Sequence, residues 1–250
     1  MGLLPYTRLA RLIPMTLRLY LEDAYLREFD TRVVASVDGW WALSHSAFYP
    51  GGGGQPQDRG HLVTEDGPLA VTALREDEDG RRLWHRVGHE AVPGTGVRGV
   101  LDWPYRYALT RHHALMHVVN TVAARHFEGL ITGVQLGPDQ SRIDLRLRAG
   151  LGAAAELEAR VNDALTVSRS ITATTIPEAE YHARPDLIRT LDVRPPIIDG
   201  RVRVVTIHGF DAQACGGTHP HDTAEIGRAR IVKRENKGRD NKRFYWTLSA

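Results

Sequence analysis

Residues 107–126 read YALTRHHALMHVVNTVAARH, a run without glycine or proline in which apolar residues recur at helical spacing. This periodicity predicts a long helix with one face turned toward a core. His113 and His117 are four residues apart, so on a helix both imidazoles project from the same face and can bind one metal ion. A helical histidine pair alone is more often part of a core or a surface, so further ligands are needed to support a metal site.

Two further candidate ligands, Cys215 and His219, lie in the segment CGGTH at residues 215–219. Cys215 is the only cysteine of the chain, which excludes an intramolecular disulfide and leaves the thiol for metal binding, for catalysis or for plain burial. Three histidines and one cysteine form a tetrahedral ligand set that suits zinc. We therefore predict a zinc site made of His113, His117, Cys215 and His219. His112 and His221 flank these residues at the wrong spacing and are expected to lie outside the ligand set.

The chain before the long helix is predicted to consist of β-strands. Short runs of strand-forming residues are separated by Asp-Gly pairs at residues 38–39, 66–67 and 79–80. Such pairs favour hairpin turns because they tolerate positive φ. This pattern predicts a small β-barrel or a β-sandwich.

A glycine-rich segment, FYPGGGGQP at residues 48–56, interrupts these strands. Its four consecutive glycines are Gly51, Gly52, Gly53 and Gly54, and Gln55 follows them. Glycines in such a run suit a close approach of the backbone to another group, although a plain flexible loop is the alternative.

The chain after the long helix mixes helices and strands. We expect strands at residues 142–147, 170–175 and 202–208, a helix from about residue 152 to residue 168, and two strands around a basic turn within residues 225–248. The change in character at residues 102–106 predicts a domain boundary there. A chain of 250 residues with 42% hydrophobic content can form two modest domains.

The charge distribution limits where a nucleic acid can bind. The formal net charge is only +2, so a surface for RNA must be local. A basic cluster near the end of the chain includes Lys237, Arg239, Lys242 and Arg243. It suits phosphate contacts, with Phe244, Tyr245 or Trp246 available to stack on an unpaired base. A solvated basic turn is the alternative interpretation.

The first residues of the chain do not have the pattern of a signal peptide or a membrane span. Arg8, Arg11, Pro14 and Arg18 interrupt the apolar residues of this stretch. We therefore expect a soluble, cytoplasmic protein.

Several segments together resemble the AlaX family and the editing domain of alanyl-tRNA synthetase. Along the chain they are FYPGGGGQPQDRG at 48–60, residues 106–117, ITGVQLGPDQSRIDL at 131–145, FDAQACGGTHPHDTAEIG at 210–227 and KRENKGRDNKRFY at 233–245. They occur in the same order as in the family. The resemblance implies an α+β fold. Residues 1–104 would form an N-terminal small β-barrel domain with the glycine-rich loop, and residues 105–250 an α/β two-layer editing domain with the zinc site. It assigns the zinc ligands to the same four residues.

The resemblance also implies a function. The expected protein is a trans-editing hydrolase that uses Zn²⁺, but not ATP, to remove serine and glycine from mischarged tRNA(Ala). The aminoacyl ester is already activated, so its hydrolysis needs mainly a positioned water and stabilisation of an oxyanion. Zinc could lower the pKa of a bound water or hold the substrate, and the sequence leaves both roles open.

Substrate selection requires that serine be accepted while alanine is refused. A buried polar group that pairs with the serine hydroxyl would lose its partner when alanine binds, which discriminates well between the two. Thr132 and Gln135, which match the segment after the family's zinc helix, are the candidates for this catalytic and specificity role. The glycine-rich loop, Gly51 to Gly54 with Gln55, is expected to close over the acceptor end of the tRNA.

Two residues depart from the family's pattern. Ala114 stands where a small hydroxyl residue is usual, and Pro220 stands where an aliphatic residue usually follows CGGTH. Neither change removes a ligand, but Ala114 lacks a hydroxyl near the metal. Two alternative functions stay open: editing of another tRNA, as in threonyl-tRNA synthetase, and a non-catalytic RNA-binding module in which zinc only stabilises the fold.

Overall fold

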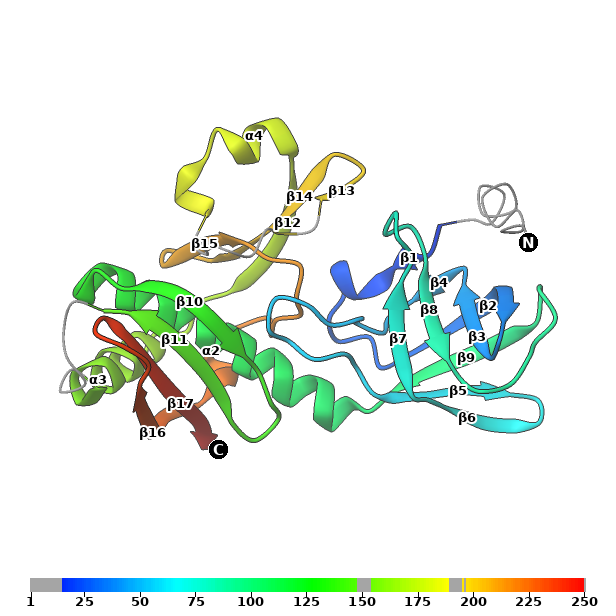
Figure 1. Cartoon of the computed structure of the whole chain (residues 1–250), viewed down its shortest axis with the longest axis horizontal. Coiled ribbons are helices and arrows are strands. Elements are labelled where there is room, and N and C mark those ends of the chain that lie inside the picture. The colour runs from blue at the N-terminus through cyan, green and yellow to red at the C-terminus, as the bar shows by residue number, and fades with distance from the viewer. Residues whose placement is uncertain (1–14, 148–153, 189–194, 196, 250) are drawn as a thin grey trace. The chain divides into compact units, whose positions relative to one another are not determined.

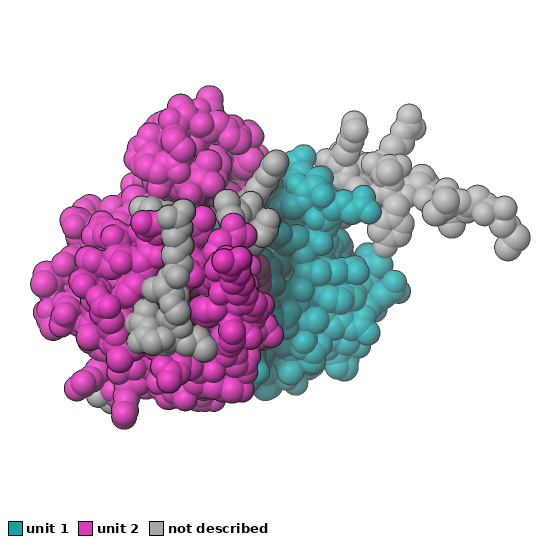
Figure 2. Space-filling model, turned by 60° about the vertical axis from the view of Figure 1, so that its left-hand side comes forward, with its two compact units in different colours: residues 1–50, 57–103 teal, residues 51–56, 104–250 magenta. Residues whose placement is uncertain are grey.

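The computed structural model describes residues 15–147, 154–188, 195 and 197–249, and it has a mixed α/β fold with many strands and few helices (Figure 1). Its chain divides into two compact units, which Figure 2 shows in different colours. The first unit comprises residues 1–50 and 57–103, and the second comprises residues 51–56 and 104–250. No helix within the described ranges is long and apolar enough to cross a membrane. The expectations that concern Arg8, Arg11 and Pro14 lie outside the described residues.

The first unit is built on one antiparallel sheet of seven strands in the order β6-β5-β9-β2-β3-β8-β7. The strands are β2 (Glu28–Val37), β3 (Trp40–Leu43), β5 (Gly60–Thr64), β6 (Gly67–Val71), β7 (Ala73–Glu76), β8 (Leu83–Arg86) and β9 (Gly96–Leu101). The edge strands β6 and β7 are separated in sequence by Thr72 alone, and the sheet has the form of a half-barrel. Short additional elements are β1 (Leu17–Arg18), η1 (Leu19–Leu21) and β4 (His45–Ser46).

The hairpin between β2 and β3 forms as its sequence predicts. Val37 pairs with Trp40, and the two turn residues between them, Asp38 and Gly39, have φ of 51° and 71°. Positive φ at both central positions matches the right-handed twist of the flanking strands. The fully buried side chains of Leu43, Phe48 and Leu62 contribute to the core of this unit.

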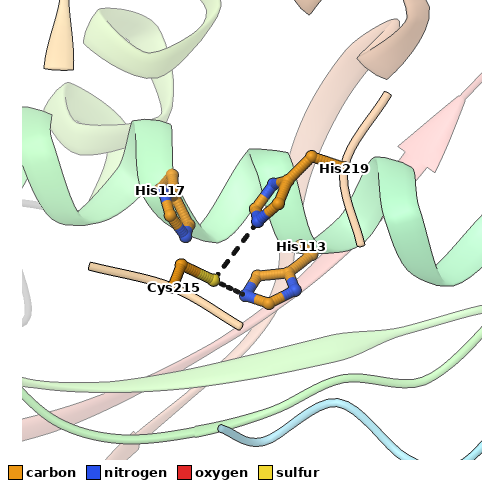
Figure 3. A group of neighbouring side chains, drawn as sticks. All are labelled: His113, His117, Cys215 and His219. Atoms are coloured by element: carbon orange, nitrogen blue, oxygen red, sulfur yellow. Dashed lines mark hydrogen bonds between the residues drawn. The ribbon is translucent and has the colours of Figure 1, made fainter. Parts of the chain in front are cut away.

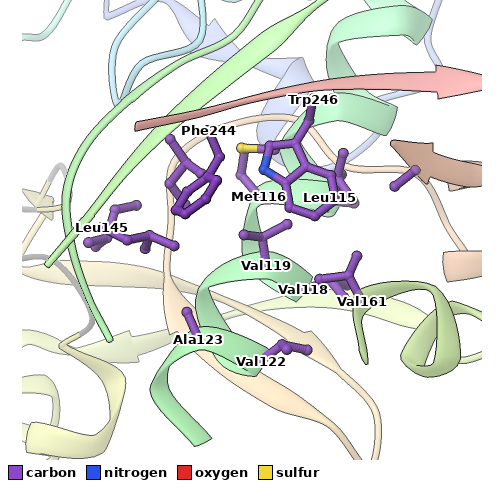
Figure 4. Packing of buried hydrophobic residues seen from close by; sticks show 14 of the residues in the cluster. Leu115, Met116, Val118, Val119, Val122, Ala123, Leu145, Val161, Phe244 and Trp246 are labelled. Atoms are coloured by element: carbon purple, nitrogen blue, oxygen red, sulfur yellow. The ribbon is translucent and has the colours of Figure 1, made fainter. Parts of the chain in front are cut away.

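The second unit is centred on a long helix, α2 (Trp103–Phe127). The expected helix is confirmed, but residues 112–123 are buried all round rather than along one face. A helix with this pattern lies inside a core instead of covering it. Its apolar residues pack with Leu145, Phe244 and Trp246 from the sheet and with Val161 from the next helix (Figure 4).

Two antiparallel sheets complete the second unit. One has the order β10-β11-β17-β16, with β10 (Leu130–Gln135), β11 (Ser141–Arg146), β16 (Arg228–Asn236) and β17 (Asn241–Ser249). The other has the order β12-β14-β13, with β12 (Ile171–Pro177), β13 (Ile197–Ile198) and β14 (Arg201–Ile207), and β15 (Asp211–Ala214) also pairs with β14. The helices are α3 (Ala154–Leu165), α4 (Glu178–His182), η3 (Pro185–Leu187) and η4 (Thr223–Ile226). The start expected for the helix at residue 152 lies outside the described residues.

The glycine-rich loop does not belong to the unit in which the sequence placed it. We expected it within a domain of residues 1–104, but residues 51–56 are part of the second unit. The backbone N–H of Leu136 donates to Gly54 O at 2.8 Å, and a side chain on Gly54 would begin only 2.5 Å from Val134 Cγ1. The loop therefore packs on the end of β10, a contact between residues far apart in the sequence.

Candidate metal centre

The helix α2 supplies two neighbouring histidines. His113 and His117 are both buried, and their ring centroids lie 5.2 Å apart, as expected for positions one helical turn apart. Because α2 is packed on all sides at this level, the backbone that carries these imidazoles has little freedom to move.

The segment after β15 supplies the other two side chains, Cys215 and His219. Arg203 on β14 holds this segment: its carbonyl accepts the N–H of Cys215 at 3.0 Å, and its Nη1 donates to Cys215 O at 3.0 Å and to Gly217 O at 2.8 Å. These bonds tie the CGGTH turn to the sheet. The contribution of Arg203 has no signal in the sequence, because it depends on the pairing of β14 with β15.

The four side chains converge on one point (Figure 3). Their ligand atoms all lie within 4.8 Å of one another. Cys215 Sγ lies 3.5 Å from His113 Nε2 and 3.3 Å from His219 Nε2. Zinc bonds of about 2.3 Å to sulfur and about 2.0 Å to nitrogen place tetrahedral S and N ligands roughly 3.5 Å apart. The predicted cluster is thus formed and could hold a metal ion.

The ionisation of the thiol also fits a bound metal ion. Burial opposes ionisation of Cys215, but His113 and His219 beside it outweigh that effect and lower the pKa of the thiol well below its usual value. A thiolate is the form of cysteine that binds metals.

The glycine-rich loop reaches this cluster through the side chain of Gln55. Gly52 and Gln55 exchange two backbone hydrogen bonds of 3.0 and 2.9 Å, so Gly53 and Gly54 form a tight turn between them. All four glycines of the loop have positive φ, which explains their number. Gln55 is 2% exposed, and its Oε1 lies 2.8 Å from His113 Nδ1.

Thr132 and Gln135 lie on β10, and their hydrogen bonds are made within the sheet rather than to the cluster. Thr132 Oγ1 donates to Asn241 Oδ1 at 3.0 Å, and Gln135 Oε1 accepts from Arg142 Nε at 2.8 Å. Gln135 is exposed and stands directly before Leu136, which bonds to the glycine-rich loop. The role of both residues in substrate selection stays a prediction.

The basic cluster contains two kinds of side chain: some are exposed, and others form hydrogen bonds within the protein. Lys237 and Arg239 are exposed in the turn between β16 and β17. Lys242 is buried and donates to Asn236 Oδ1, Gly238 O and Arg239 O at 2.7 to 2.9 Å, so phosphate binding would have to break these bonds. Arg243 makes two bonds of 2.7 Å to the carboxylate of Asp144.

The expectation that Phe244 or Trp246 stacks on a base is wrong. Both residues are fully buried in the core, because alternate residues of β17 point toward α2. Tyr245 points the other way and is half-buried, with Lys233 Nζ 5.1 Å from its ring centroid. Tyr245 is therefore the one of the three with an accessible face.

The histidines that flank the ligands lie outside the cluster, as expected. His112 is buried, and burial together with the nearby charge of Arg111 lowers its pKa to about 4. His221 is exposed. Ala114 is fully buried in the apolar cluster around α2.

The C-terminal part of the chain matches a known domain family. A family model described as the second additional domain of threonyl and alanyl tRNA synthetases matches residues 202–245, which include Cys215 and His219. The matched segment carries two of the four candidate ligands, and His113 and His117 lie outside it.

The likeness to curated proteins extends over nearly the whole chain. The alanyl-tRNA editing protein AlaX-M of Saccharolobus solfataricus is 36% identical over 237 residues, covering 94% of this chain and 99% of that protein. The AlaX-M protein of Methanosarcina acetivorans is 35% identical over 243 residues with the same coverage. The alanine–tRNA ligase of Pyrococcus abyssi is 33% identical over 230 residues, covering 89% of this chain and 25% of the ligase. The chain belongs to the AlaX-M family of alanyl-tRNA editing proteins.

Proposed function

We propose that this protein is a trans-acting aminoacyl-tRNA deacylase that hydrolyses wrongly attached serine and glycine from tRNA(Ala) with the help of zinc. The observation that carries the proposal is the buried cluster of His113, His117, Cys215 and His219, with zinc-like spacing, in a member of the AlaX-M family. The relatives are named for alanyl-tRNA editing, and the aligned region of the ligase lies within an enzyme that charges the same tRNA.

Different groups of the protein are proposed to bind the metal ion and to contact the substrate. A bound zinc ion would supply positive charge that can polarise the ester carbonyl or favour ionisation of a water molecule. The three imidazoles and the Cys215 thiolate would hold that charge at a fixed, buried point. Gly52 and Gly53 are exposed in the loop whose Gln55 reaches this point, and we propose that the acceptor end of the tRNA lies against them.

Selection of serine over alanine is proposed to depend on the end of β10. The serine hydroxyl needs a polar partner that the methyl group of alanine cannot satisfy. Thr132 and Gln135 are the proposed partners. Gln135 is exposed next to the residue that bonds to the glycine-rich loop, so its side chain can turn toward a substrate without breaking the core.

Binding of the tRNA body is proposed to involve the exposed tip of the β16–β17 hairpin. Lys237 and Arg239 are exposed there, and Tyr245 presents one face nearby on β17. Such a surface suits phosphates with an adjacent stacking position.

The activity is tested by steady-state deacylation of Ser-tRNA(Ala), Gly-tRNA(Ala), Ala-tRNA(Ala) and Ser-tRNA(Thr). We expect serine to be released from tRNA(Ala) much faster than alanine, and serine on tRNA(Thr) to be released slowly. Faster release from tRNA(Thr) would favour the alternative in which the protein edits threonine tRNA, since the family model covers both synthetases. No release from any substrate by zinc-loaded protein would favour a non-catalytic RNA-binding module.

The metal is tested separately on freshly purified protein. We expect about one zinc per chain, and less than about half of that in a Cys215→Ala variant, because removal of one of four ligands weakens a tetrahedral site strongly. Wild-type protein that carries no zinc, or a variant that keeps all of it, would contradict the assignment.

A further inference from the structure

The side chain of Gln55 links the two segments that carry the metal ligands. Its Oε1 lies 2.8 Å from His113 Nδ1 on α2 and accepts the backbone N–H of Thr218 at 3.1 Å. Its Nε2 donates to Thr218 Oγ1 at 2.8 Å. Thr218 is fully buried, so these bonds lie away from solvent. The glutamine thus bridges the helix and the CGGTH turn.

The backbone N–H of Thr218 determines which way the amide of Gln55 faces. A backbone N–H can only donate, so the amide atom that faces it must be the oxygen. The same oxygen faces His113 Nδ1, which must therefore carry a hydrogen and donate it. The lone pair of a neutral His113 is then on Nε2, the atom that lies 3.5 Å from Cys215 Sγ. The bridge selects the tautomer that can bind a metal ion through Nε2.

The surrounding backbone is shaped to admit this bridge. A Cβ on Gly217 would lie 2.2 Å from His113 Cε1, 2.5 Å from His113 Nδ1 and 2.8 Å from Gln55 Oε1. The imidazole of His113 and the amide of Gln55 therefore pack directly against the backbone of Gly217. Among the three histidine ligands, His113 alone has a hydrogen-bond partner for Nδ1 within the described residues, because those of His117 and His219 have none.

We propose that Gln55 is a positioning residue of the metal centre, which holds His113 in the metal-binding tautomer and fixes the CGGTH turn against α2. This differs from the substrate contact expected from the sequence, because both lone pairs of Oε1 are engaged within the protein. The four glycines serve this role by forming the tight turn that delivers Gln55. The proposal rests on the proposed metal binding and adds a residue outside the ligand set.

Zinc affinity tests the proposal without use of the deacylation reaction. The apparent dissociation constant for zinc is measured by competition with a chromogenic chelator for the wild type and for Gln55→Met, Gln55→Glu and Gln57→Met. We expect Gln55→Met to weaken zinc binding by about 10- to 100-fold, as removal of such outer partners of metal-bound histidines does. Gln55→Glu should stay close to the wild type, because a carboxylate accepts hydrogen bonds from both donors.

Gln57→Met is the matched control. Gln57 is a neighbouring glutamine whose Oε1 accepts the N–H of Leu74 at 3.0 Å in the first unit, so its replacement should leave zinc affinity unchanged. If Gln55→Met does not fold, as judged by thermal unfolding of the metal-free protein, Gln55→Ala removes the same acceptor without placing an apolar group against His113, and the same weakening is expected.

The outcomes separate this inference from the proposed function. If wild-type protein binds no zinc, the proposed metal function fails. If the wild type binds zinc and the folded Gln55→Met or Gln55→Ala variant binds it equally tightly, the positioning role is overturned. Equal weakening in Gln55→Met and Gln55→Glu would also overturn it, because the accepting oxygen would then not be what matters.

Discussion

Two neighbouring glycines of the glycine-rich loop, Gly53 and Gly54, differ in how much room the structure leaves for a side chain. At Gly54, φ is +87°, and a Cβ would lie 2.5 Å from Val134 Cγ1 and 2.6 Å from Val134 O. At Gly53, φ is +58° and no atom lies within 4 Å of the position of a Cβ. The two neighbours therefore have the same type of backbone conformation but different surroundings, which makes them a matched pair for mutation.

We predict that Gly54→Ala disrupts the loop while Gly53→Ala is tolerated. The alanine at residue 53 carries only the strain of a left-handed conformation, about 1–2 kcal/mol. The alanine at residue 54 also clashes with Val134, so the loop must move and withdraw Gln55 from His113. Chelator competition should show weaker zinc binding for Gly54→Ala only. If Gly54→Ala binds zinc as tightly as Gly53→Ala does, the loop can move without loss of zinc affinity.

At the scale of single elements, the β16–β17 hairpin separates side chains that hold the turn from side chains that face solvent. Lys242 uses its ammonium group to bind carbonyl and amide oxygens of the turn, and Arg243 pairs with Asp144 across β11 and β17. Lys237 and Arg239 remain exposed. Basic composition alone does not distinguish these two groups.

We predict that replacing Lys237 and Arg239 together by alanine weakens tRNA binding and makes the slope of log affinity against log salt less negative by about two, one for each phosphate that is no longer neutralised. Filter binding at several salt concentrations measures this. Arg160→Ala on α3, where Arg160 pairs with Glu156 at 2.7 Å, is the control and should leave the slope unchanged. An unchanged slope in the double variant would identify the hairpin tip as a solvated turn.

At the scale of the whole molecule, stability should depend on pH through a histidine far from the metal ligands in sequence. His85 on β8 is fully buried, with Nε2 2.9 Å from Ser46 Oγ. Burial lowers the pKa of His85 to about 4, and hydrogen bonds to the backbone of Trp41 and Leu83 only partly oppose this. The usual pKa of 6.5 applies in the unfolded chain. Between these pH values the unfolded state binds more protons than the folded state. The contribution of His85 to the free energy of unfolding is therefore fully present above about pH 6.5 and decreases as the pH drops toward 4.

We predict that His85→Gln reduces the decrease in stability between about pH 7 and about pH 5 by about 2 kcal/mol, because glutamine does not titrate. Urea unfolding of wild type and variant at both pH values measures the difference. His89→Gln, at an exposed position after β8, is the control. The same pH dependence in wild type and His85→Gln would show that His85 is not the group that titrates.

Local patterns in the sequence were sufficient to predict the four candidate metal ligands, the long helix and many of the strands. The i, i+4 spacing of His113 and His117 and the short span between Cys215 and His219 are local, and a helix or a turn converts such spacing directly into proximity. The Asp38-Gly39 turn and strands β11, β12 and β14 likewise follow from nearby residues. These features depend on backbone geometry over a few residues, which the sequence specifies.

The tertiary structure alone decided which distant segments meet. It placed the glycine-rich loop with the second unit, brought Gln55 to His113 and Thr218, and set Arg203 behind the CGGTH turn. It also buried Lys242, Phe244 and Trp246 within a segment that is basic and aromatic in sequence. Long-range strand pairing and core packing determine these contacts, and neither is encoded in the spacing of neighbouring residues. The sequence by itself therefore determined the four candidate metal ligands, whereas packing decided which residues support them.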